Sequence, residues 1–157
     1  MYLMTDLAKL PVKDTVLTEL PLNLSPKMSK YPIEKSEAQW KEELGEERYR
    51  ILRAQGTEKP FSGKYNVHFE EGTYVCGACK NPLFESGQKF ESSCGWPSFD
   101  DAIEGRIEYV KDTSFGMIRT EIRCANCGSH LGHVFNDGPT ETGQRYCVNS
   151  LSVDFIK

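Results

Sequence analysis

Apolar residues recur at helical spacing in two short stretches of the N-terminal half of the chain. Trp40 and Leu44 lie four residues apart, just after a Ser-Glu-Ala-Gln capping-box pattern at residues 36–39, so we expect a short helix to begin there. Gly45 then interrupts the pattern. Helical spacing resumes over residues 46–54 and predicts a second short helix.

From Val67 onward the apolar residues recur at every second position instead. Residues 118–123 alternate apolar or threonine side chains with charged ones, and residues 107–109 do the same. Residues 73–75 and 145–155 are further candidate strands, and glycine-rich turns separate these pieces. Because no helical pattern alternates with the strands, we expect an antiparallel, mainly β domain with its helices confined to the N-terminal side.

Residues 1–35 follow neither pattern. They hold four of the eight prolines among scattered leucines, which is typical of an irregular or extended arm packed on a domain. We therefore divide the 157-residue chain into an N-terminal arm of unknown function, residues 1–35, and one domain, residues 36–157.

Charge and hydropathy argue against two classes of partner. The chain has 19 Lys and Arg against 23 Asp and Glu, a net charge of −4, with no basic run, so we expect no nucleic-acid partner. No apolar run approaches the ~20 residues that cross a bilayer. The first ten residues contain an acid and a base and no small-residue cleavage site. We therefore expect no membrane association and a cytoplasmic location.

Four of the six cysteines form two C-x-x-C pairs, Cys76 with Cys79 and Cys124 with Cys127. Together they supply the four thiolates of a closed tetrahedral zinc site, which would clamp two distant parts of the domain. We predict one structural zinc per chain, and a full coordination shell leaves it no catalytic role. Two alternatives are a redox-active C-x-x-C pair and a set of three disulfides, which suits a reducing cytosol poorly.

Cys147 stands alone, in a run with strand character. If that run is a strand, Arg145, Cys147 and Asn149 leave the same face, and the cation stabilises a thiolate. His130-Leu131-Gly132-His133 lies upstream, and both imidazoles reach one pocket if the chain bends at the glycine. The alternative is that Cys147 is a small buried apolar residue.

Cys94 is the other lone cysteine, in the stiff segment Cys94-Gly95-Trp96-Pro97. An aromatic face packs well against a thioether or its methyl group, so Trp96 can form the wall of a site for a methionine-like group, although many tryptophans are plain core residues. Cys147 and Cys94 suit a nucleophile and a resolving thiol, because a sulfenic acid on one condenses with the other to form a disulfide.

Three stretches together resemble the methionine-R-sulfoxide reductases of the B type: Cys94–Phe99, Gly132–Pro139 and Arg145–Ser150. The two C-x-x-C pairs also match the zinc-containing members of that family. The resemblance covers about residues 36–157, including the loop Thr57–Gly63, and several long motifs in the right order make chance an inadequate explanation.

The resemblance implies a fold of two small antiparallel sheets, with the active site on one sheet and the zinc remote from it. It also implies that the R epimer of methionine sulfoxide, in a protein or free, is reduced through a Cys147 sulfenic acid and a Cys94–Cys147 disulfide. Thioredoxin would recycle that disulfide, so the implied partners are oxidised protein or peptide methionine and thioredoxin. The implied catalytic residues are Cys147, Cys94, His130, His133 and Asn149, and the implied substrate-binding residues are Trp96, Arg145 and Asp137.

Two other functions fit parts of the sequence. A non-enzymatic zinc-binding β module for protein interaction would use the same cysteine pairs, since fold does not dictate function. It leaves Arg145, Cys147, His133 and Trp96 unexplained. A general thiol-disulfide oxidoreductase would need one C-x-x-C pair that is free of metal.

Overall fold

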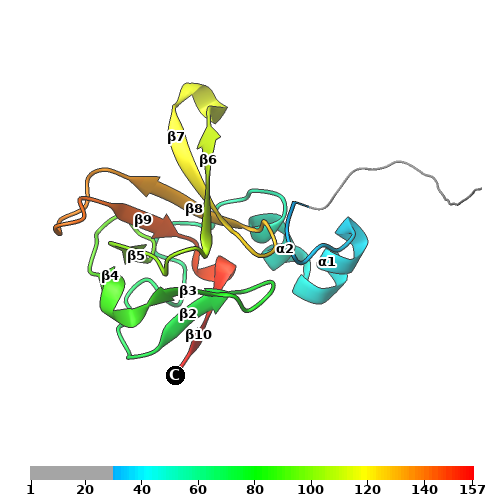
Figure 1. Ribbon diagram of the computed structural model, residues 1–157, viewed down its shortest axis with the longest axis horizontal. Coiled ribbons are helices and arrows are strands. Elements are labelled where there is room, and N and C mark those ends of the chain that lie inside the picture. The colour runs from blue at the N-terminus through cyan, green and yellow to red at the C-terminus, as the bar shows by residue number, and fades with distance from the viewer. Residues whose placement is uncertain (1–29) are drawn as a thin grey trace, which may run out of the picture. The chain divides into compact units, whose positions relative to one another are not determined.

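Two short helices begin the folded part of the computed structural model, which describes residues 30–157 (Figure 1). α1 spans Glu37–Leu44, and the predicted capping box precedes it: the Gln39 N–H donates to the Ser36 hydroxyl, while the Ser36 N–H donates to the Gln39 side chain. α2 spans Glu46–Leu52 and ends two residues before the predicted boundary. Gly45 joins the helices at a φ of +82°, which glycine adopts readily because it has no Cβ.

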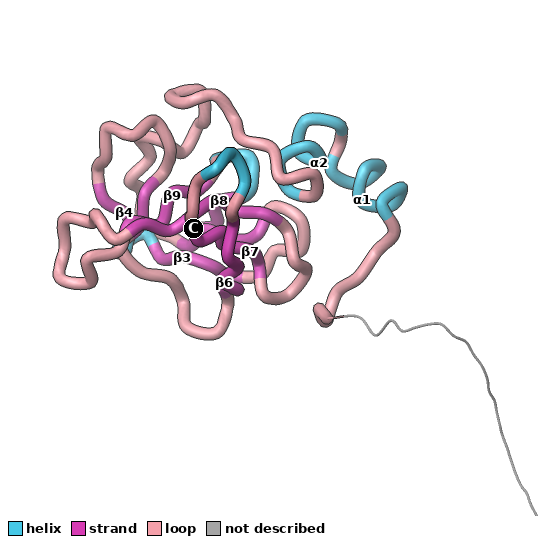
Figure 2. The backbone as a smooth tube through the Cα atoms, turned by 90° about the horizontal axis from the view of Figure 1, so that it is seen from above, coloured by secondary structure: helices cyan, strands magenta, loops and turns pink. Residues whose placement is uncertain are grey.

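Nine strands form two antiparallel sheets within the described residues, as the sequence predicted. The smaller sheet has the order β10-β2-β3, and the larger has the order β4-β5-β9-β8-β7-β6. The strands are β2 Thr73–Cys76, β3 Pro82–Glu85, β4 Lys89–Phe90, β5 Ser98–Phe99, β6 Ile107–Asp112, β7 Arg119–Cys124, β8 His130–Phe135, β9 Arg145–Val148 and β10 Val153–Ile156. Three 3-10 turns are η2 Ser86–Gln88, η3 Ser114–Gly116 and η4 Ser150–Ser152. Both helices lie to one side of these strands (Figure 2).

The predicted arm lies almost wholly in residues 1–29, outside the described part of the chain, so its form stays a prediction. Residues 33–157 form one compact unit. Within residues 30–157, no helix combines the length and the apolar character that crossing a membrane requires.

Aromatic rings join the two sheets in the core. Phe84 of the smaller sheet stacks on Phe99 of the larger one, with ring centroids 4.2 Å apart. Tyr74 meets Phe99 edge-on at 5.1 Å, and all three rings are fully buried. Such pairs are worth about 0.5–1.5 kcal/mol beyond the area that they bury. The sheet that carries Cys147 is thereby held against the sheet that carries the first C-x-x-C pair.

The prediction of a single strand over residues 145–155 is wrong. This stretch consists of β9 in the larger sheet, the turn η4, and β10 in the smaller sheet. The buried Glu58 carboxylate accepts hydrogen bonds from the N–H groups of Ser150 at 2.9 Å and Leu151 at 3.0 Å. These N–H groups therefore have a side-chain partner in place of a strand partner, and the chain leaves one sheet for the other.

β7 uses both of its faces. Its apolar face buries Ile122 completely, as the alternation predicted. Its charged face is not simply solvated, because Glu121 is only 2% exposed, whereas Ile118, just before the strand, is 81% exposed. A buried carboxylate needs partners to offset its desolvation, and those of Glu121 are His130, Arg123 and Gln55.

Candidate active site and metal centre

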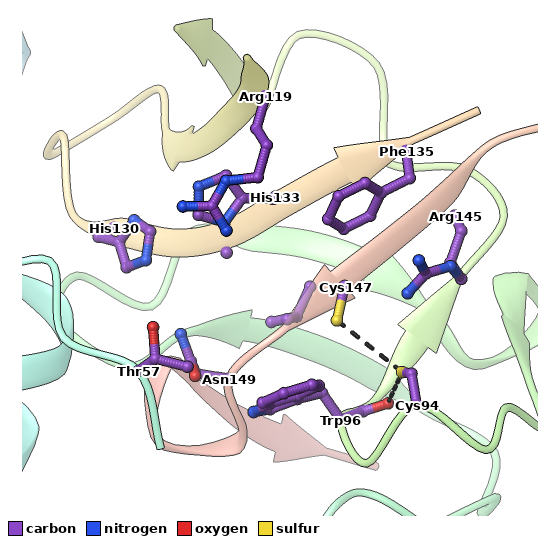
Figure 3. Close-up of a pocket in the computed structure, with 12 residues that line it drawn as sticks. Thr57, Cys94, Trp96, Arg119, His130, His133, Phe135, Arg145, Cys147 and Asn149 are labelled. Atoms are coloured by element: carbon purple, nitrogen blue, oxygen red, sulfur yellow. Dashed lines mark hydrogen bonds between the residues drawn. The ribbon is translucent and has the colours of Figure 1, made fainter. Parts of the chain in front are cut away.

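A cavity of about 220 Å³ lies on the charged face of the larger sheet (Figure 3). It gathers seven of the eight residues that the sequence assigned to catalysis or substrate binding, and it leaves out Asp137. The residues that line it are Thr57, Cys94, Trp96, Arg119, His130, Gly132, His133, Phe135, Arg145, Cys147, Val148 and Asn149. Segments far apart in the sequence therefore meet at one site, while their roles there remain predictions.

β9 lies at the centre of the site. Arg145, Cys147 and Asn149 all line the cavity, as expected for alternate residues of an extended chain. Cys147 is paired across the sheet with His133 on one side and with Ser98 on the other. This register places the His133 and Cys147 side chains as direct cross-strand neighbours on one face.

The bend that lets both histidines reach the cavity lies at Leu131, one residue before the expected glycine. Ile122 of β7 pairs with Gly132, while the next residue of β7 pairs with His130, so Leu131 is left over as a bulge. Gly132 is required for another reason. A Cβ at this position would overlap the Cys147 carbonyl oxygen, so only glycine allows β8 and β9 to approach this closely.

Each histidine is held by a carboxylate that the sequence analysis did not single out. His130 Nδ1 lies 2.7 Å from Glu121 Oε2, and His133 Nε2 lies 2.7 Å from Asp112 Oδ2. Because an ionised carboxylate only accepts hydrogen bonds, these ring nitrogens carry the hydrogen and leave the opposite nitrogens as acceptors. The charged alternation of residues 119–123 was the available signal for Glu121, and the same face brings Arg119 to the cavity wall.

The environment holds both carboxylates in the charged form. Burial raises the pKa of Glu121, but hydrogen bonds from His130, Arg123 and Gln55 outweigh it and lower that pKa to about 2. The Ser114 N–H and then His133 hold the pKa of Asp112 well below its usual range. The pKa of His133 is lowered by burial, although Asp112 opposes this effect. The His133 ring is therefore poised as a neutral group that orients other atoms.

The two lone cysteines meet in the cavity. The sulfurs of Cys94 and Cys147 are 3.9 Å apart, and Cys94 Sγ also lies 3.4 Å from the Ser98 hydroxyl. The hydrogen bond between the sulfurs, with burial, raises the pKa of the Cys147 thiol, and the same bond lowers the pKa of Cys94 to about 4. The Arg145 cation opposes this rise in the pKa of Cys147 without outweighing it. The pair therefore holds one negative charge between two sulfurs, whereas sequence reasoning placed that charge on Cys147 alone.

Asp137 acts through Arg145 and does not face the cavity. Arg145 donates from Nε to Asp137 at 2.8 Å and from a terminal nitrogen at 3.2 Å, and the Asp137 side chain is 66% exposed. The guanidinium also lies over the Phe135 ring, 4.5 Å from its centroid. A planar cation held from two sides keeps one orientation toward the thiol pair.

Asn149 and Trp96 are fixed by one backbone segment. The Asn149 side chain accepts from the Glu58 N–H at 3.1 Å and donates to the Leu131 carbonyl at 3.2 Å, and Asn149 is only 3% exposed. The Trp96 indole N–H donates to the Glu58 carbonyl at 3.1 Å. Both polar groups of Asn149 are thus used within the protein, which favours a positioning role, and the Trp96 ring forms one wall of the cavity (Figure 3).

The arrangement combines a nucleophile, a cation, and ring nitrogens on opposite sides of a small cavity. A group whose central atom sits over Cys147 would have Trp96 on one side and the histidines on another. The cavity is smaller than the roughly 300–1,000 Å³ that drug-sized ligands occupy, so it suits a single side chain.

The other four cysteines form a separate cluster that could hold a metal ion. The sulfurs of Cys76, Cys79, Cys124 and Cys127 all lie within 4.8 Å of one another, with 3.7 Å between Cys76 and Cys127 and 3.6 Å between Cys79 and Cys124. Zinc bound at about 2.3 Å to four sulfurs in a tetrahedron places them about 3.8 Å apart. The donor set and its spacing therefore fit zinc, and none of these cysteines lines the cavity.

Hydrogen-bond donors surround this cluster. The Ala78 N–H points at Cys76 Sγ and the Asn126 N–H at Cys124 Sγ, each at 3.4 Å, and the Asn81 amide donates to Cys124 Sγ at 3.5 Å. Such donors stabilise thiolate ligands and orient them. The C-x-x-C turns thus already carry the outer partners of a metal-thiolate site.

Comparison with known proteins gives a consistent result. Residues 44–157 match the SelR domain family. A relative from Variovorax paradoxus (strain S110), named peptide methionine sulfoxide reductase MsrB, is 54% identical over 132 residues, which cover 80% of this chain and 97% of the relative. Relatives of the same name from Methanosarcina barkeri and Teredinibacter turnerae are 53% and 56% identical, covering 82% and 77% of this chain and 91% and 90% of the relatives. Among solved structures, the Mis18 'Yippee-like' domain is similar at a TM-score of 0.46 and 16% identity, over 56% of this chain and 97% of that one.

The position of Arg145 predicts the pH at which Cys147 reacts. In a Cys94→Ser background the thiol pair is gone, so Arg145 is the cation that lowers the pKa of Cys147. Replacing Arg145 with methionine keeps an apolar stem and should move the alkylation of Cys147 to higher pH, measured by mass mapping of iodoacetamide-treated protein. The Cys94→Ser parent is the control. An identical pH profile in both proteins would show that the cation does not act on this thiol.

Proposed function

The chain belongs to the SelR domain family of B-type methionine sulfoxide reductases and is an oxidoreductase that reduces methionine sulfoxide, and from this premise we propose the course of its reaction. The substrate is the R epimer, the intermediate is a sulfenic acid on Cys147, and Cys94 resolves it to a disulfide that thioredoxin reduces. The observation that carries this proposal is the 3.9 Å separation of the Cys94 and Cys147 sulfurs inside a side-chain-sized cavity. A non-enzymatic zinc module has no use for such a pair.

Substrate binding would use three different walls of the cavity. The methyl group of the sulfoxide packs on the Trp96 ring, the sulfur lies over Cys147, and the oxygen points toward His130 and His133. A sulfoxide sulfur is pyramidal, with a methyl group, a side-chain methylene and an oxygen. Because three fixed contacts accept only one hand of such a centre, one epimer reacts and the other does not.

The first chemical step transfers oxygen to Cys147. The Cys147 proton passes to the Cys94 thiolate, and the Cys147 sulfur attacks the sulfoxide sulfur. A histidine that has taken up a solvent proton on its free ring nitrogen, or a water that it orients, delivers a proton to the sulfoxide oxygen, because an unprotonated oxide is a very poor leaving group. The sulfoxide sulfur is reduced by two electrons and leaves as methionine, while Cys147 is oxidised to the sulfenic acid.

The second step closes a disulfide. The Cys94 sulfur attacks the sulfenic sulfur, and the hydroxyl leaves as water after taking up a proton. A disulfide bond is about 2.05 Å long, so the two sulfurs have only about 2 Å to travel. An external dithiol then reduces the bond by exchange, and we propose thioredoxin for this role and the cytoplasm as its location.

We also propose that one zinc ion binds to Cys76, Cys79, Cys124 and Cys127. The ion would supply structural stability by joining the end of β2 to the end of β7, while its four thiolates leave no position for substrate. The convergence of both C-x-x-C pairs on one point favours this role over that of a redox-active pair. The same two segments belong to the two different sheets, so the ion would link them as the aromatic core does.

The test of the reaction is an epimer-resolved assay with dithiothreitol as reductant. The R sulfoxide of N-acetylmethionine should be consumed about 100-fold faster than the S sulfoxide, or more, measured by chiral chromatography. Cys147→Ser should lower the rate about a thousandfold or more, because an alcohol cannot replace the thiolate. Equal rates on the two epimers would reject the stereochemical assignment, and an active Cys147→Ser protein would reject the nucleophile.

The two halves of the reaction should separate in Cys94→Ser. This protein should still release about one methionine per active site in a single turnover and leave a sulfenic acid that dimedone labels. With thioredoxin its steady-state rate should collapse, while dithiothreitol, which reaches the sulfenic acid directly, should restore part of the rate. Full turnover with thioredoxin, together with no Cys94–Cys147 bond in peptide maps of the oxidised wild type, would contradict the resolving role.

The zinc proposal is tested by metal analysis of purified protein, with an expected content of one zinc per chain. Cys124→Ser should lose the metal and at least about 3 kcal/mol of stability, or about 10 °C in melting temperature, because one missing ligand opens a closed site. Cys94→Ser is the matched control, since it removes a cysteine outside the cluster and should keep both metal and stability. A metal-free wild type that melts normally would refute the site.

A further inference from the structure

Exposed apolar side chains gather on the hairpin formed by β6 and β7. Eight large apolar side chains are exposed in residues 30–157, and four of them belong to this hairpin: Tyr109 at 53%, Phe115 at 88%, Met117 at 45% and Ile118 at 81%. Three of these four, Phe115, Met117 and Ile118, lie within four consecutive residues. Single exposed apolar residues are ordinary, whereas a group of them is typical of an interaction site. The hairpin extends well beyond its neighbour β8 (Figure 1), so its end is open to a partner.

The end of this hairpin, residues 114–118, is called the hairpin tip below. Phe115 in the tip has a φ of +58°, a left-handed conformation that is sterically unfavourable for a bulky residue. Residues held in such conformations cluster at ligand-binding and switch regions. The Phe115 ring gains little from burial in return, because it is the most exposed of the eight. A phenylalanine at this position therefore contributes little to the stability of the fold.

The hairpin tip is continuous with the substrate cavity. Arg119, the first residue of β7, lines the cavity directly, and Asp112, the last residue of β6, holds His133. An ion pair of 3.3 Å between Arg119 and Asp112 closes the base of the tip. In Figure 3 the wall formed by Arg119 and His133 faces the wall formed by Trp96 and Cys94. The tip is therefore joined, through Arg119, to the wall that lies across the cavity from Cys94.

The size of the cavity decides what must lie against the tip. A cavity of about 220 Å³ is smaller than the roughly 300–1,000 Å³ of pockets for drug-sized ligands, so it accommodates an oxidised methionine but not a peptide segment. The residues before and after the methionine must then lie outside the cavity, along its rim. The hairpin tip comes directly before Arg119, which lines the cavity, so the flanking chain is the part of a substrate that can reach the tip.

We propose that the hairpin tip docks the polypeptide that flanks the oxidised methionine and favours apolar side chains in it. The inference rests on the proposed function and names its substrate class: methionine sulfoxide within an apolar stretch of accessible polypeptide. Methionine is among the residues most often buried in proteins, so a core segment exposed by damage presents this chemistry. A reductant is a less suitable occupant, because Arg119, which joins the tip to the cavity, lies across the cavity from Cys94.

The test compares three substrates with dithiothreitol as reductant, which removes any contribution from thioredoxin. These are N-acetylmethionine R-sulfoxide, a short peptide with one methionine R-sulfoxide between leucines and valines, and the same peptide with serines and glycines there. The variant is Phe115→Asn combined with Ile118→Thr. Asparagine tolerates a positive φ and threonine keeps the β-branched shape, so the backbone should be retained. Val67→Thr, at a site that is 76% exposed and does not line the cavity, is the matched control.

We expect the ratio of kcat/KM for the apolar peptide to that for N-acetylmethionine sulfoxide to fall about tenfold in the double variant, mainly through KM. The ratio for the serine-glycine peptide should change little, and Val67→Thr should leave both ratios as in the wild type. An unchanged apolar ratio in a double variant that melts normally would overturn the proposal. A second assay with thioredoxin as reductant gives the KM for thioredoxin. A raised value in the double variant, with the apolar ratio unchanged, would also overturn the proposal, since the tip would then dock the reductant.

Failure of the proposed function would look different. A wild type that reduces no R sulfoxide, free or in either peptide, would refute the proposed reaction and with it this inference. A wild type that reduces all three substrates, with a double variant that discriminates among them as the wild type does, would refute the docking surface alone.

Discussion

The site depends on the hydrogen bonds of one buried residue, Glu58. Its carboxylate accepts from the two N–H groups that follow β9, its own N–H donates to the Asn149 side chain, and its carbonyl accepts the Trp96 indole. Asn149, which directly follows β9, and the Trp96 ring, which forms a wall of the cavity, are thus tied to a single point. A buried carboxylate is costly to desolvate, and the hydrogen bonds from backbone donors offset that cost. Loss of this residue would release the Trp96 wall and the end of β9 together.

Electrostatics divide the cavity into two sides. Arg145, oriented by Asp137, faces the thiol pair and favours its negative charge. On the other side, Glu121 and Asp112 each hold one ring nitrogen of a histidine, so the histidines keep fixed orientations and present their free nitrogens. The proposed reaction begins with a thiolate and ends by protonating an oxygen, and this separation would serve both steps. If the same residues formed one cluster, the Arg145 cation would pair with Glu121 or Asp112 and would no longer act on the thiol pair.

The fold separates the six cysteines into two groups that suit two kinds of chemistry. Four lie within 4.8 Å of one another among N–H donors, an environment for a closed metal-thiolate site. Two lie in an open cavity, near enough to exchange a proton and to form a bond. The aromatic stack of Phe84 on Phe99 connects the two sheets, and the proposed zinc would connect them as well. The strand that carries Cys147 therefore depends for its stability on the sheet that carries the first C-x-x-C pair.

Local pattern alone determined much of this protein: the capping box of α1, the strands around the cysteine pairs, and the alternation that places Arg145, Cys147 and Asn149 on one face. These features need only neighbours within a few residues, so a period of two or a C-x-x-C spacing is enough to predict them. Tertiary structure decided that residues 145–155 divide between two sheets, that Leu131 forms the bulge, and that Glu121 and Asp112 hold the histidines. It also decided that the thiol charge is shared with Cys94. Each of these depends on a contact between distant segments, such as the backbone approach at Gly132 or the hydrogen bonds of the Glu58 carboxylate. The spacing of residues along the sequence does not determine which distant groups come into contact.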